Sequence, residues 1–436
     1  MKLLVYLLFM VSLSIGRELT LGEAIELALK NNRLIASARK DIKAQELELR
    51  AVRGSLFPRI KLEETFTRTD MPAYAFMSKL NQERIGPQDF NPARLNDPSA
   101  VNNFETKFTI EIPIWLGGKI QSANRISEHE YKAVSLEAKR REEEVIRQVY
   151  QAYMDAVLAK EAIRVSQKAV EDATEHARLA ESMRSVGMAL LSDVLRAKVH
   201  LSKAEEHLKR AQKDYHIAKK ALELVMGVSL GEFEVVEIGG CPELRVEGLK
   251  DRAVNRSDIK AVEQRLKSLE EAYRLTLSDN LPQIYAFAQY ALHSKNLPLG
   301  TDGTGYMVGL SLSWSFETGM TTLRKAQANL ERRSSLEERL KLLRDSAVFE
   351  VDRALSEYEK AMNSLKSAED RIKASGEVLR VMEIRYKNGL ARMVDVLDAQ
   401  TELDNARFER LQAIKACHKA YIDILFSAGM TEEVKR

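Results

Sequence analysis

The hydrophobic pattern of this chain switches between two periods, and each period marks a different kind of element. In four stretches apolar residues alternate with polar ones, as Phe108, Ile110 and Ile112 alternate with Lys107 and Thr109. A period of two predicts β-strands that are apolar on one face and polar on the other. The predicted strands are 57–68, 104–116, 281–291 and 305–316.

Two much longer stretches, 119–184 and 320–387, have the period of a helix. Their apolar residues recur every three or four positions, and neither Pro nor Gly interrupts the first between Lys119 and Met183. This spacing predicts coiled-coil helices, each roughly 100 Å long, whose many alanines allow close approach. The seam residues are Val145, Val149, Ala152, Ala156, Ala159 and Ile163, then Val351, Ala354, Tyr358, Ala361, Leu365, Ala368 and Ile372.

A motif that follows each long helix shows that the chain is a tandem duplication. Gly187–Ala197 and Gly389–Ala399 both read G-x5-D-V-L-x-A. Glycine permits the left-handed turn that ends a helix, and Ser192 and the aspartates suit the start of the next helix. The motif therefore predicts the tip of a helical hairpin, present twice in an internal two-fold repeat. The two repeats are 17–226 and 249–428.

The remaining segments connect these elements. Thr20 is expected to cap a first helix, which breaks at Asn31-Asn32 and resumes to about Arg53. Residues 69–103 are rich in Pro, Asn and Asp, which predicts a long loop. The predicted tips are 185–192 and 388–394, the return helices 193–226 and 395–428, the connector 227–248, a further helix 255–279, and the tail 429–436.

The first 16 residues have the pattern of a secretory signal. Lys2 provides a positive start, an apolar run follows from Leu3 to Leu13, and the small residues up to Gly16 suit a cleavage site. The run is too short for a membrane helix, and no later stretch is apolar over the length that such a helix needs. We therefore expect an exported protein in which any membrane span consists of strands.

Composition narrows the classes of function. The chain is 45% hydrophobic, 6% aromatic and 30% charged, which favours long exposed helices over a compact core. The charges are interspersed, so no nucleic-acid-binding face is expected. His200 and His207 share a helix face without metal-ligand spacing and are expected in solvent. We predict no catalytic constellation, no metal site and no cofactor. Cys241 and Cys417 form a disulfide or remain two free thiols.

The predicted strands suit a membrane but do not close a barrel. Their length and alternation match lipid-facing strands, and open sheet edges are not tolerated in lipid. Other copies of the chain would then complete the edges, so that strand number rises in fours. The alternative is a soluble sheet with one face on a core. Trp115, Trp314 and Phe316 stand at matching strand ends, where an aromatic girdle would lie, although core aromatics give the same pattern.

The order of elements, together with several motifs, resembles the TolC family of outer-membrane efflux and secretion channels. The motifs are Leu19-Thr-Leu-Gly-Glu-Ala-Ile25, Phe57-Pro58, Pro113-Ile-Trp-Leu-Gly-Gly118 and both tips. The resemblance implies a mainly α homotrimer, with a twelve-strand outer-membrane barrel that continues into a twelve-helix periplasmic tunnel. It also implies a periplasmic adaptor and an inner-membrane pump as partners. The location would be the outer membrane of a Gram-negative-type bacterium, with contacts to its lipid and most of the mass in the periplasm.

The resemblance further implies a gate where the tunnel closes at the tips. Asp395 and Asp398 match positions at which family members place acidic rings, and such rings attract cations and repel anions. The alternative is that Asp395 merely caps the return helix, and the two roles are compatible.

Other tip residues are assigned roles by the same match. Asp193 and Tyr386 match positions that, in some members, form polar links between the hairpins. The arginine that those members carry two residues after the second-tip glycine is Ala391 here, with Arg392 next to it. The expected adaptor contacts are Val186, Gly187, Met188, Asn388, Gly389 and Leu390.

Three functions compete at this point. The first is a passive exit duct of a tripartite efflux or type I secretion system, opened at the tips by adaptor and pump. The second is a soluble, exported coiled-coil protein that serves as a structural or adaptor-like spacer in the periplasm. The third is an enzyme on a helical scaffold, for which the sequence has no constellation of residues.

Overall fold

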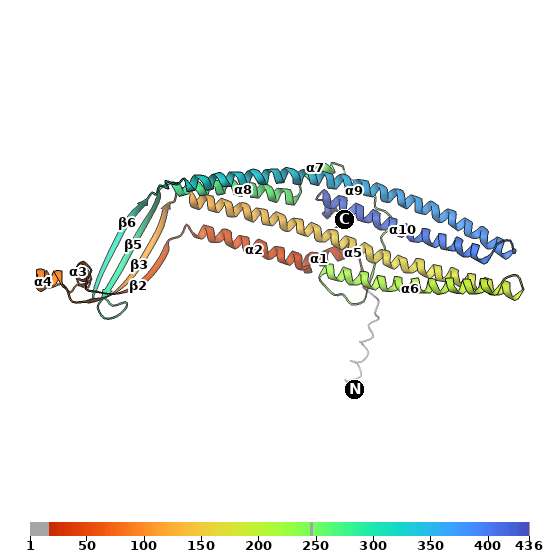
Figure 1. Cartoon of the computed structure of the whole chain (residues 1–436), viewed down its shortest axis with the longest axis horizontal. Helices are drawn as coiled ribbons and strands as arrows, with labels where there is room; N and C mark the ends of the chain where they lie inside the picture. The colour runs from red at the N-terminus through yellow and green to blue at the C-terminus, as the bar shows by residue number, and fades with distance from the viewer. Residues whose placement is uncertain (1–16, 245–246, 436) are drawn as a thin grey trace, which may run out of the picture. The chain divides into compact units, whose positions relative to one another are not determined.

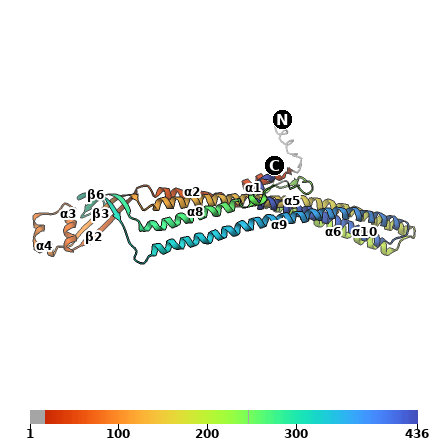
Figure 2. The ribbon, with the colours of Figure 1, turned by 90° about the horizontal axis from the view of Figure 1, so that it is seen from above.

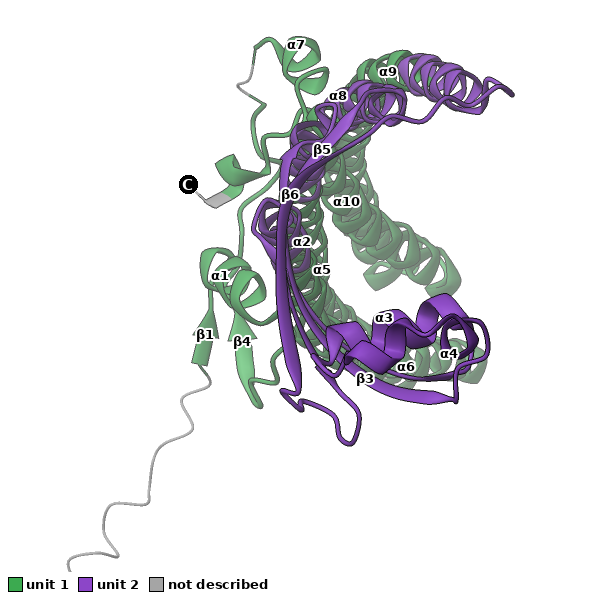
Figure 3. Cartoon of the chain, turned by 90° about the vertical axis from the view of Figure 1, so that its left-hand side faces the viewer, with its two compact units in different colours: residues 1–42, 135–261, 339–436 green, residues 43–134, 262–338 purple. Residues whose placement is uncertain are grey.

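The computed structural model describes residues 17–244 and 247–435, so the predicted signal at 1–16 lies outside the described residues. The chain divides into two units, which Figure 3 shows in different colours. The first comprises residues 1–42, 135–261 and 339–436, and the second residues 43–134 and 262–338. Among the described residues, no helix combines the length and the apolar character that crossing a membrane requires.

The second unit is built on a four-stranded antiparallel sheet in the order β2-β3-β5-β6. Its strands are β2 (Arg59–Thr69), β3 (Val101–Trp115), β5 (Gln283–Ser294) and β6 (Gly303–Ser313). Strand β3 starts three residues before its predicted start at 104, and β6 ends three residues before its predicted end at 316. Register pairs Ile60 with Ile110 and Ala288 with Val308, so the alternation of all four strands falls in phase.

The two faces of this sheet differ as the sequence pattern predicts. One face carries exposed apolar side chains, which no other part of the second unit covers. They include Ile60, Leu62, Ile110, Ile112, Tyr306, Val308, Leu310 and Leu312. The opposite face carries polar side chains, among them Glu63, Lys107 and Glu111. A sheet with an apolar face turned outward and a polar face turned inward is the arrangement of barrel strands.

The expected long loop at 69–103 contains helices instead. It folds into α3 (Pro72–Asn81), a 3₁₀ turn η1 (Pro87–Phe90) and α4 (Pro92–Asn96). Three of the four prolines that suggested a loop, Pro72, Pro87 and Pro92, stand at the first helical position, where the missing N–H costs nothing. The side chain of Asn91 caps α4 by accepting from the Ala93 N–H at 2.9 Å. The loop prediction was wrong because it took helix-starting residues for helix breakers.

Most of the two helical hairpins lies in the first unit, and only residues 119–134 and 321–338 of their long helices belong to the second. Their helices are α5 (Lys119–Ser185) with α6 (Leu191–Met226), and α9 (Thr321–Lys387) with α10 (Met393–Ser427). Both hairpins turn at the same end of the unit (Figure 1; Figure 2). The predicted seams are buried at positions such as Val149, Ala156, Val351 and Ala361. Small seam residues thus bring the helices together.

A small sheet joins the start of the chain to the connector. Strand β1 (Arg17–Leu19) pairs in parallel with β4 (Phe233–Val235), inside the predicted connector. The hydroxyl of Tyr153 donates to the Leu19 carbonyl at 2.8 Å and accepts from the Val236 N–H at 3.1 Å. Thr20 and Glu23 form a capping box at α1 (Leu21–Asn31), as expected of Thr20.

The remaining elements are short or lead toward the sheet. They are α2 (Arg33–Gly54), α7 (Leu249–Ala253), α8 (Ser257–Leu277), the 3₁₀ turn η2 (Ser278–Asn280) and, in the predicted tail, η3 (Thr431–Lys435). The predicted helix 255–279 is therefore shorter at both ends. Cys241 of the connector and Cys417 of α10 form a disulfide, which decides between the two alternatives that the sequence leaves open.

Candidate functional site

The two hairpin tips have the same backbone structure. Gly187 and Gly389 adopt φ angles of 76° and 71°, in the left-handed region. At the first tip Gly187 N donates to the Arg184 carbonyl at 2.9 Å, and Met188 N donates to the Met183 carbonyl at 2.8 Å. The second tip repeats both bonds with the same lengths, from Gly389 and Leu390. This pair of bonds is the Schellman motif, and its left-handed residue favours glycine at both positions.

The aspartate of each motif then starts the return helix. Asp193 accepts from the Leu190 N–H at 3.2 Å, and Asp395 accepts from the Arg392 N–H at 2.8 Å. These carboxylates satisfy backbone donors that a helix start leaves free. The return helices therefore begin at Leu191 and Met393, two residues before their predicted starts. Ser192 does not cap, because it already lies inside the helix.

At the second tip, the carboxylate of Asp395 is stabilised in its ionised form. The Arg392 guanidinium lies 3.1 Å from the Asp395 carboxylate. The backbone N–H of Arg392, followed by its side chain, holds the pKa of Asp395 below its usual value. Asp395 is therefore ionised throughout the neutral range. Asp398 lies one turn further along α10 and is exposed. The capping role of Asp395 is thus seen in the structure, and its role in a gate stays a prediction.

The residues expected to contact an adaptor lie at the surface of the tips. Val186, Met188 and Leu390 are apolar and more than half exposed, and Asn388 is exposed between them. The methyl group of Met188 lies beside Gly389, so the two tips also contact each other. An exposed apolar cluster of this kind suits contact with another protein, and its role as the adaptor contact stays a prediction.

Tyr386 is placed behind the tips rather than at their surface. It is 3% exposed within an apolar cluster that joins both hairpins, with Met183, Val194, Met393 and Val396 among its members. Burial, with the nearby Asp193 as a second cause, raises the pKa of Tyr386. Among the described residues its hydroxyl has no hydrogen-bond partner. The predicted polar link between Asp193 and Tyr386 is therefore not formed within one chain.

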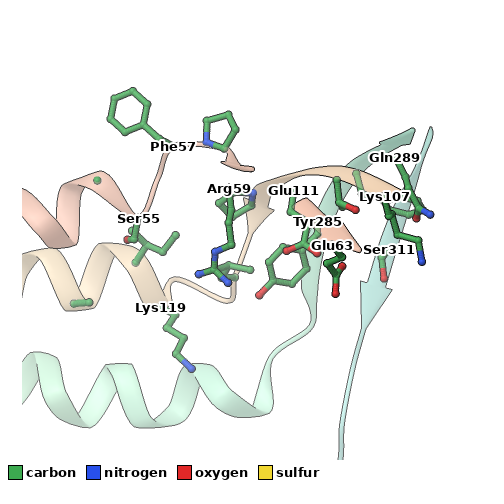
Figure 4. Close-up of a pocket in the computed structure, with 18 residues that line it drawn as sticks. Ser55, Phe57, Arg59, Glu63, Lys107, Glu111, Lys119, Tyr285, Gln289 and Ser311 are labelled. Atoms are coloured by element: carbon green, nitrogen blue, oxygen red, sulfur yellow. The ribbon is translucent and has the colours of Figure 1, made fainter. Parts of the chain in front are cut away.

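The polar face of the sheet forms a second candidate surface, a pocket of about 1050 Å³ (Figure 4). Charges of both signs line it, including Arg59, Glu63, Lys107, Glu111 and Lys119. A lining with charges of both signs is typical of the water-filled interior of a barrel, whose inward side chains are polar. The sequence pattern indicated this face without showing that it is concave.

The predicted interface aromatics lie at one end of the sheet. Trp115 is the last residue of β3, and its indole is partly exposed. Trp314 and Phe316 lie just beyond β6, with ring centroids 4.7 Å apart, and Trp314 Nε1 donates to the Asn280 carbonyl at 3.0 Å. An apolar ring with a hydrogen-bonded N–H, as in Trp314, suits a membrane interface. The placement of the three aromatic residues in a girdle stays a prediction.

Comparison with known families identifies the group to which the chain belongs. The model of the outer membrane efflux protein family matches residues 24–228 and 249–430. This chain belongs to the outer membrane efflux protein family. The two matched segments correspond to the two repeats, and a comparison with curated proteins finds no match.

Solved structures of outer membrane efflux proteins and related channels have the same fold. CusC superposes with a TM-score of 0.81 at 15% identity, over 94% of this chain and 92% of that chain. The Campylobacter jejuni CmeC outer membrane channel gives a TM-score of 0.79 at 17% identity, over 94% and 86%. The open state of the Neisseria gonorrhoeae MtrE outer membrane channel gives 0.76 at 18%, over 94% and 89%.

Family membership confirms several predictions from the sequence. The fold class is that of the outer membrane efflux proteins, mainly α-helical with a barrel portion, four strands and two long hairpins per chain. The protein is an outer-membrane channel component rather than an enzyme, with a large periplasmic helical part. The alternatives of a soluble periplasmic spacer and of an enzyme are thereby overturned.

Sequence reasoning missed a polar cluster buried behind the tips of this efflux protein. His176 Nε2 lies 3.1 Å from Gln400 Oε1, and the Gln400 amide donates to Asp404 at 3.0 Å. Arg407 donates to Asp404 at 3.1 Å and to Asp172 at 3.2 Å. Gln400 is 0% exposed, and burial raises the pKa of Asp404. The signal was Gln400 itself, a polar residue in the apolar seam between Val396 and Leu403.

The histidines near this cluster correct a further expectation. Only His207 of the pair on α6 is exposed, as expected. His200 is half-buried against Thr401 of α10, at 3.4 Å, and burial lowers its pKa. His200 faces the opposite hairpin, and a single-helix pattern cannot show which face a neighbouring helix covers.

Proposed function

We propose that three copies of this chain form the outer-membrane exit duct of a tripartite efflux or type I secretion system. The observation that carries the proposal is the incomplete sheet with its exposed apolar face. Strands β2 and β6 are the two edges of the sheet, and among the described residues each has one side unpaired. Unpaired edges are not tolerated in lipid, so β2 of one copy would pair with β6 of the next. Three copies give twelve strands.

The helical hairpins support the same assembly. Helix α6 leaves Leu195, Val199, Ile217 and Leu224 exposed on one side, although α10 buries most of its apolar residues. An edge helix with an uncovered apolar stripe needs a neighbour. A cyclic arrangement supplies it by placing the next copy beside α6. The hairpins of three copies would then enclose a periplasmic tunnel.

The tips would form the gate of this duct. In a trimer, Asp395 and Asp398 each become a ring of three carboxylates, and Arg392 keeps Asp395 ionised and in place. Such rings would bind cations at the narrowest point of the duct. Tight binding slows the passage of ions, because an ion must also leave its site for conduction to continue. Asp193 and the unpartnered hydroxyl of Tyr386 are the groups that would make polar links between hairpins when the tips shift. The open state of MtrE shows that one channel of this fold adopts an open conformation.

The exposed tip residues would bind the periplasmic adaptor. The apolar surface consists of Val186, Met188 and Leu390, at the turn of each hairpin and thus at the end remote from the first residues of α5 and α9. The turns themselves are shaped by Gly187, Asn388 and Gly389. The adaptor, coupled to an inner-membrane pump, would spread the tips and open the duct. Solutes would then pass without any chemistry supplied by this chain.

The proposal is tested by fractionation and bilayer recording of the full-length protein. We expect it in the outer-membrane fraction, as a detergent-stable oligomer of three chains that inserts into planar bilayers and gives discrete conductance steps. Recovery as a water-soluble monomer that forms no channels would contradict the proposal. The variant Val186→Asp tests whether a partner that co-purifies with the protein binds at the tips. The matched control is Glu206→Gln, at a distant exposed site.

A further inference from the structure

The helical insert between β2 and β3 lies against the polar face of the sheet. The amide of Gln82, just after α3, donates to the Asn102 carbonyl at 2.7 Å and to Asn103 Oδ1 at 2.8 Å. Asn103 shares the side of β3 that carries Lys107 and Glu111, because alternate residues of a strand face the same way. Gln82 is buried at this contact. The insert is therefore anchored on the face that turns inward in a barrel.

A second contact places the end of α3 on the same face. A Cβ atom on Gly303, the first residue of β6, would collide with the carbonyl oxygen of Asn81. Gly303 pairs with His293, whose Nδ1 lies 3.4 Å from the Asn103 amide on the polar face. Only glycine allows the backbone of α3 to approach β6 this closely. Figure 3 shows α3 and α4 on the concave side of the curved sheet.

The insert is folded in its own right. Ala75 is fully buried, and the rings of Phe76 and Phe90 meet edge to face with centroids 5.8 Å apart. Lys79 pairs with Asp89 at 3.0 Å, and both side chains are largely buried. The corresponding connection of the second repeat, 295–302, is too short to hold such a body. The insert is thus a feature of one repeat only.

One side of α3 is apolar and uncovered. Ala75 and Gln82 face the sheet and are buried, so the opposite side of the helix carries Ala73, Met77 and Leu80. All three are exposed in the single chain, and Tyr74 extends the apolar surface. This side points away from the sheet, toward the middle of whatever the sheet encloses.

We propose that the α3 helices of three copies pack against one another through Met77 and Leu80 and close the outer mouth of the barrel. This inference rests on the trimeric duct proposed above. Twelve strands at normal spacing and tilt enclose a circumference of about 75 Å, so the backbone radius is about 12 Å. A helix is about 10 Å thick, and three helices held on the inner wall must meet at the axis. The occupant of the apolar side of α3 is therefore a second copy of α3.

The position of this lid makes it a separate barrier from the tips. The insert follows the end of β2 that is remote from α2, and it precedes the end of β3 that is remote from α5. In the duct these strand ends face the cell exterior, and the hairpin tips face the periplasm. Opening the tips alone would leave this second constriction in series, which still passes small ions, so export of larger solutes requires the lid to move as well.

Proximity of the three helices is tested by cross-linking the full-length protein in isolated outer membranes. We expect Met77→Cys, treated with a short bismaleimide, to give covalent dimers, because two of three copies can be joined. The matched control is Ile110→Cys, on the apolar outer face of β3, which should give none. The native Cys241–Cys417 disulfide leaves no other thiol to react.

Closure is tested by single-channel conductance in planar bilayers. One variant replaces residues 71–99 by the short connection 295–302, and a second, Met77→Glu with Leu80→Glu, separates the helices by charge without removing them. Each is recorded alone and with Asp395→Asn and Asp398→Asn, so that a closed tip does not mask the effect. We expect conductance to rise severalfold in both lid variants with neutralised tips.

The outcomes separate the lid from the duct. Channels whose conductance is unchanged in both lid variants, without Met77→Cys dimers, would overturn the lid and leave the exit duct standing. Failure of the unmodified protein to form trimers or channels would overturn the duct, and the lid with it. Cross-linked dimers with higher conductance in both lid variants would support the lid.

Discussion

The two return helices start from the same motif, yet they occupy different environments. Leu397 of α10 is 7% exposed, and its counterpart Leu195 of α6 is 54% exposed. Gln400 is 0% exposed inside the helix packing, and its counterpart Lys198 reaches out to pair with Glu181 at 2.8 Å. The motif determines the turn, because the Schellman bonds and the capping aspartate need only local backbone. The packing of the following helix is decided by which neighbours the duplicated chain places around it.

The difference between α6 and α10 shows that the two repeats have different packing roles. Helix α10 packs on several sides and carries the polar cluster around Gln400. Helix α6 keeps an apolar stripe free, which the proposed trimer would cover with the next copy. In the proposed trimer, one repeat would supply the interior of the helical wall and the other its joining edge.

The largest effect is expected from shortening the two equivalent leucines. Leu397→Ala removes a buried side chain and leaves a cavity, so it should lower the free energy of unfolding by about 3 kcal/mol. Leu195→Ala should change the unfolding of the single chain by less than about 0.5 kcal/mol, because the side chain is exposed there. Denaturant unfolding followed by helical circular dichroism in detergent measures both. Equal losses in dissociated single chains would contradict the assignment of α6 as an edge helix.

A smaller effect is expected from removing the cation of the buried cluster. Arg407→Leu leaves Asp172 and Asp404 without their shared partner and should cost about 2 kcal/mol at neutral pH. Burial raises the folded-state pKa of Asp404 above its unfolded value. Protonation of Asp404 therefore stabilises the fold fully at a pH below the pKa of Asp404 in the unfolded state. This contribution is lost as the pH rises through the pKa of Asp404 in the folded state. The deficit of the variant should therefore shrink as the pH falls toward about 4.

The control for this experiment lies on the same helix. Arg410 is 3.9 Å from Glu369, and both side chains are substantially exposed. Arg410→Leu should have little effect at any pH, because an exposed ion pair contributes little. A loss in Arg407→Leu that stays constant between pH 4 and pH 8 would show that Asp404 does not titrate with the cluster.

Local patterns were predictable from the sequence, and contacts between distant segments were not. The strand period and the G-x5-D-V-L-x-A motif predict sheet faces and tips because they depend on neighbouring residues. The three-residue strands β1 and β4 are too short to show a period, and their pairing joins Leu19 to Val235 across most of a repeat. The helix α3 was missed because Pro72 starts a helix as readily as it breaks one.

The candidate site divides in the same way. Gly187, Gly389, Asp193 and Asp395 were found because the tip needs those residue types at that spacing. The cluster around Gln400 was missed because His176 and Arg407 come from helices more than two hundred residues apart and meet only after packing. Tyr386 was placed in a polar link by resemblance, and the structure shows it buried with a hydroxyl that finds no partner among the described residues.

The most direct test of the account is the single-channel conductance and ion selectivity of the trimer in planar bilayers, with the acidic residues of the second tip neutralised. Asp395→Asn with Asp398→Asn should raise the conductance and lower the preference for cations, because the rings no longer hold cations at the constriction. The cation preference of the unmodified channel should persist from pH 8 to about pH 5, since Asp395 has a lowered pKa. The control Glu402→Gln, on an exposed side of α10, should leave both properties unchanged. Unchanged conductance and selectivity in the double variant would contradict a gate at the second tip.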